Sequence, residues 1–392
     1  MNRDCGNYNG ICKTKPDEPV RVLHVVTYMK RSGLETMIMN YYRHIDRRKI
    51  QFDFLEHRFE RSDFDDEIES LGGRIYRMPP INPISLKYRK MLDDFFSEHK
   101  EYRIVHCHMN CMSSIPLYYA KKNNVDVRIA HSHTSNQKHD LKYPIRIFYR
   151  SRIPSVATDL FACGEEAGKW MYGGKKYRIV RNAVDMNAMH FDGEARNRIR
   201  NNLAITADNI IVGHIGRFCE MKNHEFLVEV FREVLKLNNE ARLVLVGDGP
   251  GLNKIKRKVE NIGIKNRVVF YGISENISEV LSAIDVFVLP SIYEGVPMTL
   301  VEARASGLRC IISDTVAAEE KVLIGGVKRL SLAEPPAIWA KEIVKASATY
   351  ARHPINKIFE KEYGIAFQAQ MLQDFYLSRC CSGLFKESRN MQ

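Results

Sequence analysis

Two glutamates in the second half of the chain stand on either side of a segment that suits phosphate binding. Glu294 and Glu302 flank Pro297, a residue type favoured at the start of a helix. The N-terminus of a helix leaves backbone N–H groups free to bind an anion. Because a carboxylate repels a phosphate, we expect the two glutamates to accept hydrogen bonds from hydroxyl groups, such as those of a sugar and a ribose.

Two cationic residues, Arg217 and Lys222, lie in a loop that follows an apolar run at residues 210–215. Two cations on one loop can hold a diphosphate, which arginine binds through paired hydrogen bonds. The alternative interpretation is a pair of solvated surface charges. The glutamates in the same half of the chain favour the diphosphate.

Two pairs of alternate histidines end two predicted strands, His106 with His108 and His131 with His133. Alternate residues of a strand share one face, as metal ligands would. No carboxylate or cysteine motif completes a zinc set, so we predict no metal site. Either the pairs belong to a substrate site, His131 above all, or they are polar ends of strands.

The elements that must position these residues alternate between strands and helices along the chain. Short Val/Ile/Leu runs without polar alternation predict parallel strands buried on both faces, and intervening helical patterns predict βαβ units. The predicted strands are 20–27, 51–56, 74–77, 103–108, 127–131, 159–163, 178–180, 210–215, 242–246, 268–271, 285–289 and 309–313. The predicted helices are 34–45, 65–71, 85–100, 113–122, 144–153, 165–171, 225–237, 252–261, 277–283, 297–306 and 336–350.

The length of 392 residues predicts two domains, and the pattern makes each an α/β, Rossmann-like, doubly wound fold facing a common cleft. We assign residues 20–187 to the first domain and 203–355 to the second. The polar segment 188–202 is the predicted linker. We expect a disordered lead-in at 1–19, and a C-terminal helix and tail at 356–392 that crosses back to the first domain.

The composition narrows the class of protein and of partner. Lys and Arg number 59 against 47 Asp and Glu, a formal charge of +12, which favours an anionic partner. No apolar run is long enough for a transmembrane helix, and the polar N-terminus is not typical of a signal peptide. Nine cysteines without a CxxC pair indicate a reducing cytoplasm. No groove-reading motif accompanies the charge, so we predict no nucleic-acid binding.

A basic, aromatic segment at residues 142–152 adds to the positive charge, with Arg146 and Arg150 as neighbours on a predicted helix. It can be a solvated helix face. It can also be an interfacial helix that contacts an anionic membrane.

The order of motifs in the second half resembles the retaining family 4 glycosyltransferases, and the first half resembles their polysaccharide-assembly branch. The matching motifs of the second half are Gly216-Arg217, Lys222-Asn223, 245–250, 269–272, 285–291, Glu294-x7-Glu302 and Gly307. Those of the first half are 22–25, Ser32-Gly33, His106-x-His108, His131-x-His133, 161–164 and 180–185.

The resemblance implies a GT-B fold and a role for each matching residue. Arg217 and Lys222 would neutralise the donor diphosphate, Glu302 would bind the ribose, and Glu294 with His131 would act beside the donor sugar. Further residues are assigned to the donor site (Gly216, Tyr271, Gly272, Ile273, Gly295, Val296, Pro297 and Met298), to an acceptor or phosphate loop (Ser32 and Gly33) and to the acceptor side (His108 and His133). No cofactor or metal is required, because cationic groups stabilise the leaving diphosphate.

The implied reaction is retaining transfer of a sugar from a nucleoside-diphosphate sugar, UDP-linked by resemblance with GDP left open, to a glycan or polyprenyl-phosphate-linked acceptor in capsule or exopolysaccharide assembly. The implied location is cytoplasmic, at the inner face of the cell membrane. Two alternatives stay open. One is a nucleotide-sugar epimerase or phosphorylase on the same architecture, and the other is a non-catalytic subunit of an assembly complex.

Overall fold

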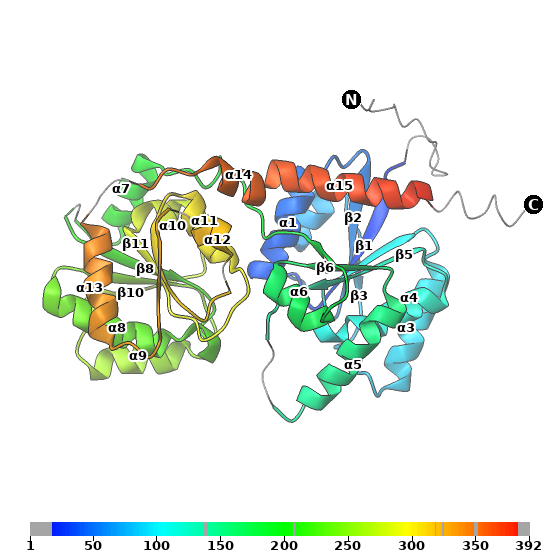
Figure 1. The fold of residues 1–392 in the computed structure, drawn as a ribbon, viewed down its shortest axis with the longest axis horizontal. Helices are drawn as coiled ribbons and strands as arrows, with labels where there is room; N and C mark the ends of the chain where they lie inside the picture. The colour runs from blue at the N-terminus through cyan, green and yellow to red at the C-terminus, as the bar shows by residue number, and fades with distance from the viewer. Residues whose placement is uncertain are drawn as a thin grey trace, which may run out of the picture.

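Two α/β domains lie side by side and are bridged by the C-terminal helices (Figure 1). The computed structural model describes residues 18–136, 140–206, 208–317, 319–323, 325–348 and 352–382. The predicted lead-in therefore falls almost wholly outside the described residues, as does the tail from residue 383.

The first domain is built on a seven-stranded parallel sheet in the order β3-β2-β1-β4-β5-β6-β7. Its strands are β1 (Val20–Val26), β2 (Ile50–Glu56), β3 (Ile75–Arg77), β4 (Ile104–Cys107), β5 (Val127–Ser132), β6 (Asp159–Ala162) and β7 (Arg178–Ile179). The intervening helices are α1 (Gly33–His44), α2 (Asp65–Ser70), α3 (Leu86–Glu98), α4 (Ser114–Lys122), α5 (Tyr143–Val156) and α6 (Glu165–Tyr172).

The second domain contains a six-stranded parallel sheet in the order β10-β9-β8-β11-β12-β13. Its strands are β8 (Ile211–Ile215), β9 (Arg242–Val246), β10 (Val268–Gly272), β11 (Val286–Leu289), β12 (Arg309–Ser313) and β13 (Val327–Leu330). Its helices are α8 (His224–Leu237), α9 (Leu252–Asn261), α10 (Ile277–Ala283), α11 (Met298–Ala305), α12 (Glu320–Leu323) and α13 (Pro336–Ser347).

Burial explains why the apolar runs predicted the strands. Every residue of β2, β8 and β11 is buried, as expected for parallel strands covered by helices on both faces. The prediction of two doubly wound domains is thereby confirmed. In both sheets the first strand, β1 or β8, lies in the interior, and the later strands are added first on one side of it and then on the other. This reversal of strand order gives each domain a switch point at the carboxyl ends of its parallel strands.

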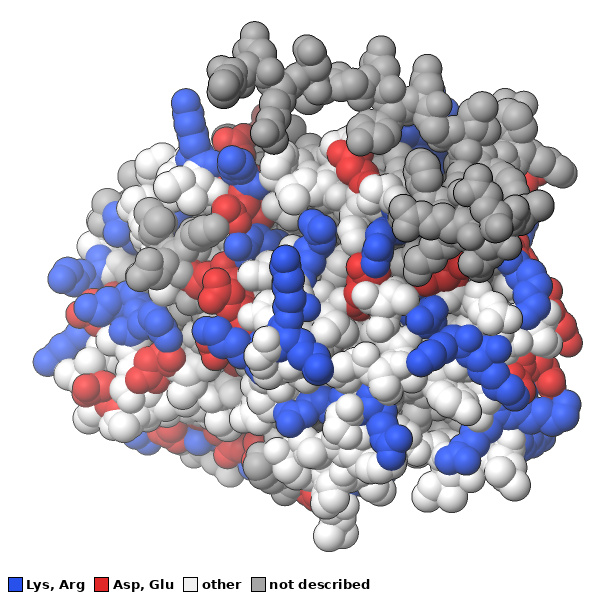
Figure 2. All heavy atoms as spheres, turned by 45° about the vertical axis from the view of Figure 1, so that its right-hand side comes forward, with Lys and Arg blue, Asp and Glu red and all other residues white. Residues whose placement is uncertain are grey.

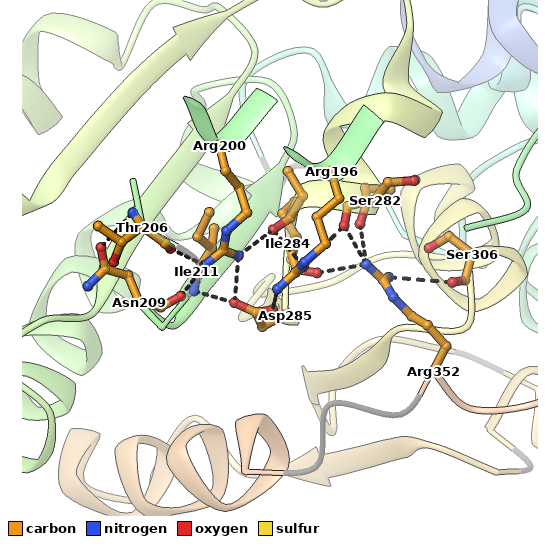
Figure 3. Close-up of polar contacts among 12 residues, drawn as sticks. Arg196, Arg200, Thr206, Asn209, Ile211, Ser282, Ile284, Asp285, Ser306 and Arg352 are labelled. Atoms are coloured by element: carbon orange, nitrogen blue, oxygen red, sulfur yellow. Dashed lines mark hydrogen bonds and ion pairs between the residues drawn. The ribbon is translucent and has the colours of Figure 1, made fainter. Parts of the chain in front are cut away.

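The segment predicted as a linker contains helix α7 (Gly193–Asn202), which packs against the second domain. Arg196 donates to Asp285 at 2.6 Å and Arg200 to the same carboxylate at 3.2 Å (Figure 3). The pattern did not predict this helix, because its buried face carries only two apolar residues, Ala195 and Ile199, beside the buried side chain of Arg200.

Arg352 joins the chain that follows α13 to the same region of the second domain (Figure 3). Its guanidinium donates to carbonyl groups at the ends of α10 and α11, where helices favour a cation. The acceptors are Leu281, Ser282, Ile284 and Ser306, at 2.6–3.4 Å.

The C-terminal segment forms two helices, α14 (Lys357–Tyr363) and α15 (Ile365–Ser382), where the pattern predicted one. The predicted crossing back to the first domain is confirmed. The side chain of Gln373 accepts a hydrogen bond from the backbone N–H of Asp46 at 2.9 Å, and Arg379 pairs with Asp159 at 2.5 Å. No described helix has the length and apolar character needed to span a membrane.

Candidate active site

The loops that follow β8, β9 and β10 are held together by backbone hydrogen bonds. Gly216 N donates to Val246 O at 2.9 Å, and Gly247 N donates to Gly272 O at 2.7 Å. Gly247 has φ +131°, and a Cβ at this residue would lie 2.3 Å from Gly216 O. The glycine is needed for this close approach, which also explains the strand-to-helix turn predicted around it.

Lys222 and Glu294 meet at the carboxyl ends of the strands of the second sheet. Lys222 Nζ lies 2.7 Å from Glu294 Oε1, and their side chains are 11% and 9% exposed. The Ser291 hydroxyl donates to the same Glu294 oxygen. Two candidate residues that lie far apart in the sequence are therefore one buried ion pair.

Arg217 and Glu302 have charged ends that no described residue pairs with. Arg217 is exposed, and no carboxylate in the described part of the chain pairs with it. Glu302 is buried, and none of the described residues donates a hydrogen bond to its carboxylate. Burial raises the pKa of Glu302 to about 7. A buried carboxyl without a protein partner can accept hydrogen bonds from a bound hydroxyl.

The loop that carries Glu294 contacts the first domain. Asn182 Nδ2 donates to Val296 O at 2.6 Å, and a Cβ at Gly295 would lie 3.7 Å from Cys163 Sγ. Helix α11 begins at Met298, so Pro297 is its N-cap residue and not its first helical residue.

The N-termini of helices α1 and α11 face each other across the domain boundary. A Cβ at Gly33 would lie 3.7 Å from both Cβ and Cγ of Met298. Ser32 is the N-cap of α1, and its hydroxyl donates to Glu35. Two converging helix N-termini favour an anion, because both present unpaired backbone N–H groups and a positive dipole end.

Three residues assigned to the donor site lie at the end of the edge strand β10 (Tyr271 and Gly272) or directly after it (Ile273). Tyr271 is half-buried, Gly272 has φ +81°, and the side chain of Ile273 is 60% exposed. An exposed apolar side chain at this end of the sheet is available to pack on a base. Contact with a base stays a prediction.

Five histidines of the first domain form one cluster beneath the ends of β1, β4 and β5. The members are His24, His106, His108, His131 and His133, and the first four are at most 3% exposed. The predicted pairs are thus brought together, and a fifth ring, that of His24, joins them.

Hydrogen bonds join the rings in two chains. His24 Nδ1 lies 3.0 Å from His108 Nε2, and His108 Nδ1 lies 2.9 Å from His133 Nε2. In the other chain His106 Nε2 lies 3.1 Å from His131 Nδ1. Burial lowers the pKa of all five rings, to about 3 for His24 and His133, so the cluster is neutral at pH 7.

Two sets of three rings bring nitrogen atoms within 4.8 Å of one another, His24 with His106 and His108, and His108 with His131 and His133. Three histidines can hold zinc. Many of these nitrogens are already paired with each other, and the sets contain no charged ligand. The absence of a metal requirement therefore stays a prediction.

Sequence reasoning missed two members of this region, His24 and Tyr376. His24 lies directly opposite His106 in the register of β1 and β4. A parallel pairing of the two predicted strands would have indicated that neighbourhood. Tyr376 lies in α15, and its hydroxyl contacts His106 at 2.6 Å, which no local pattern signals.

The comparisons with known proteins agree with this architecture. The family model described as Glycosyl transferases group 1 matches residues 195–350. EpsF of Bacillus subtilis, named as a glycosyltransferase, is 38% identical over 339 residues, which cover 84% of this chain and 88% of EpsF. The capsular polysaccharide biosynthesis glycosyltransferase CapH of Staphylococcus aureus is 25% identical over 378 residues, 92% of this chain and 99% of CapH.

Among solved structures, HepE of Anabaena in complex with UDP-glucose superimposes with a TM-score of 0.76 at 17% identity, covering 91% of this chain and 99% of HepE. At that identity the likeness concerns the fold alone. Together with the extended similarity to EpsF, it establishes the family. The chain belongs to the group 1 glycosyltransferases, the retaining family 4 enzymes of GT-B fold.

Proposed function

We propose that this enzyme moves a sugar from a UDP-sugar to a glycan or polyprenyl-phosphate-linked acceptor during assembly of a capsule or exopolysaccharide. The observation that carries the proposal is the buried pair of Lys222 and Glu294, with Arg217 on the same loop as Lys222 and Glu302 on the helix that follows Glu294. At the carboxyl ends of β8 and β11, the two cations would bind a diphosphate and the two carboxylates would accept hydrogen bonds from hydroxyl groups. CapH, named for capsular polysaccharide biosynthesis, supports the pathway class, and HepE, crystallised with UDP-glucose, supports the nucleotide.

The proposed chemistry is substitution at the anomeric carbon with loss of the nucleoside diphosphate. Arg217, Lys222 and the N-termini of α1 and α11 would stabilise the charge that develops on the leaving diphosphate. This stabilisation replaces a divalent metal, so none is required. Glu302 would bind the ribose, while Glu294 and His131 would contact the donor sugar.

The proposed acceptor is bound to a membrane, and α5 supports a docking surface for it. Ile145 and Phe148 on α5 are exposed by 43% and 51% and stand at helical spacing, and Leu141, two residues before the helix, is 99% exposed. The exposed cations Lys142 and Arg152 lie beside them. Apolar side chains flanked by cations are typical of a helix that lies on an anionic bilayer.

The surface view supports an anionic partner for this side of the molecule. Figure 2 shows several Lys and Arg side chains separated by uncharged surface on its lower half. The enzyme would therefore act at the inner face of the cell membrane.

A thermal-shift screen over nucleoside diphosphates and their sugars, followed by a transfer assay with the donor that binds, tests the proposal. A ligand that binds the native state raises its melting temperature. We expect UDP and one UDP-sugar to do so, and transfer to depend on an added acceptor. An isomerised donor would favour an epimerase, phosphate-dependent cleavage a phosphorylase, and failure to bind any nucleoside diphosphate a non-catalytic subunit.

A further inference from the structure

A chain of two hydrogen bonds leads from the C-terminal helix α15 to His131 on β5. The hydroxyl of Tyr376 lies 2.6 Å from His106 Nδ1, and His106 Nε2 lies 3.1 Å from His131 Nδ1. All three side chains are at most 1% exposed. The direction of these bonds decides which nitrogen of His131 carries hydrogen.

The Tyr376 hydroxyl fixes the direction of the first bond. Within the described part of the chain, His106 Nδ1 is its one polar partner. If the hydroxyl accepted a hydrogen bond from an Nδ1–H group, its own hydrogen and the lone pair of His131 Nε2 would both be buried without a partner among the described residues. If the hydroxyl donates, only the N–H group at His131 Nε2 is left without one, which costs less free energy. The hydroxyl therefore donates. Burial raises the pKa of Tyr376, so the group keeps its hydrogen at all working pH values.

The tautomer of His106 then fixes the direction of the second hydrogen bond. A neutral imidazole has one N–H group, and burial keeps this ring neutral by lowering its pKa. Because Nδ1 of His106 accepts from Tyr376, its hydrogen is on Nε2. That N–H donates to Nδ1 of His131, and the hydrogen of the neutral His131 ring is then on Nε2.

Nε2 of His131 has no hydrogen-bond partner among the described residues, although it is buried. An unpaired buried N–H group is available to an oxygen atom of a bound substrate. The other half of the cluster does not compete for it, since His108 bonds to His24 and His133.

We propose that Tyr376 is a positioning residue that acts through His106 to hold His131 in the tautomer with hydrogen on Nε2, ready to donate to an oxygen of the donor sugar or its diphosphate. The substrate contact rests on the proposed function, whereas the tautomer does not. The last helix of the chain would thereby set the hydrogen-bonding state of a residue on the central sheet of the first domain.

The test is ¹⁵N NMR of the imidazole rings in full-length protein labelled at histidine, with His106→Gln and His131→Gln used for assignment. The two ring nitrogens of a neutral histidine differ strongly in shift according to which one carries hydrogen. We expect the wild-type rings of His106 and His131 both to be protonated at Nε2. In Tyr376→Phe we expect both to become mixtures of the two tautomers.

A matched control is Tyr41→Phe. The hydroxyl of Tyr41 is equally buried and donates to the Arg181 carbonyl at 2.8 Å, but it bonds to no histidine. We expect Tyr41→Phe to leave the tautomers and kcat unchanged. We expect Tyr376→Phe to lower kcat at least twofold, in line with loss of one tautomer, with the KM for the donor unchanged.

Either of two results would overturn the proposal: hydrogen on Nδ1 of His131 in the wild-type protein, or unchanged tautomers in Tyr376→Phe. The NMR arm needs no substrate. If the tautomers behave as expected but no sugar is transferred, the proposed function fails and the positioning role of Tyr376 stands.

Discussion

Lys222 Nζ and Glu294 Oε1 lie 2.7 Å apart in a nearly buried ion pair that joins the loop after β8 to the loop after β11. The pair gives Lys222 two roles. Lys222 neutralises Glu294 before substrate arrives, and a bound diphosphate would share its charge.

Replacement of either partner should abolish transfer while the fold survives. In Lys222→Ala and Glu294→Gln we expect kcat to fall at least about 100-fold, as for other groups that stabilise charge in a transition state. Steady-state transfer assays measure the loss, and circular dichroism checks the fold. Lys258→Ala is the matched control, because Lys258 pairs with Glu229 at 2.8 Å at the surface of the second domain. Wild-type turnover in either site variant would refute the assignment.

Binding of UDP should depend on the ionisation of Glu302. Burial raises the pKa of this carboxyl to about 7, and only its ionised form is a full acceptor for ribose hydroxyls. We expect UDP to bind about tenfold more weakly at pH 6 than at pH 8, since each pH unit below the pKa reduces the ionised fraction tenfold. Isothermal titration calorimetry measures this ratio. A Glu302→Gln variant should bind UDP more weakly and keep only the shallower pH slope that the terminal phosphate of UDP contributes. An equal pH slope in that variant would speak against Glu302.

The same carboxyl should make the free enzyme less stable at neutral pH than in mild acid. Its pKa is higher in the folded chain than the ordinary 4.5, so its protonated form favours folding, and that contribution is lost as pH rises through about 7. We expect Glu302→Gln to be more stable than the wild type by up to about 3 kcal/mol at pH 8 and by about half as much at pH 5.5. Urea unfolding at the two pH values measures the difference.

The histidine cluster should make the enzyme sensitive to acid. The folded pKa of His24 is lowered from 6.5 to about 3, so its neutral form favours folding above pH 6.5, and that stability is lost as pH falls. Each such ring should lower the free energy of unfolding by about 1.4 kcal/mol for every pH unit below about 6. Urea unfolding between pH 5 and 7 measures the slope. His24→Gln should make the slope of unfolding free energy against pH shallower by the equivalent of about one proton. His190→Gln, a substitution at an exposed position, should leave the slope unchanged.

Removal of metal should change neither activity nor stability. Binding of an ion in the cluster would break the ring-to-ring bonds of His108, at 3.0 and 2.9 Å, and would bury charge without a carboxylate beside it. We expect dialysis against a chelator to leave kcat and the melting temperature unaltered. A lower melting temperature after chelation, with zinc recovered by elemental analysis, would contradict this.

Charge on the exposed face of α5 should weaken binding to membranes. We expect Ile145→Asp with Phe148→Asp to lose flotation with phosphatidylglycerol vesicles, because the two apolar side chains can no longer enter the bilayer. Leu237→Asp is the control, since Leu237 is 52% exposed in the second domain. Flotation that is the same with phosphatidylcholine, or unaffected by the double substitution, would exclude docking on an anionic surface through α5.

The local hydrophobic pattern was enough to predict most strands, and the elements that it missed were missed for physical reasons. The run 285–289 predicted β11 because a strand covered on both faces must be apolar throughout. In β13 the residues are half-buried or exposed, so no such run exists. In α7 the buried face has only Ala195 and Ile199 as apolar residues, and Arg200 beside them donates to the Ala283 carbonyl at 3.1 Å.

By itself the sequence determined the two α/β domains and the residue types that suit a sugar diphosphate, because alternating apolar runs and loop residues are local properties of the chain. Only the tertiary structure decided which of these residues act together. It paired Lys222 with Glu294, 72 positions apart, and joined Tyr376 to His106, 270 positions apart. Such contacts depend on strand order and on the path of the C-terminal helix, and neither is written in any short segment.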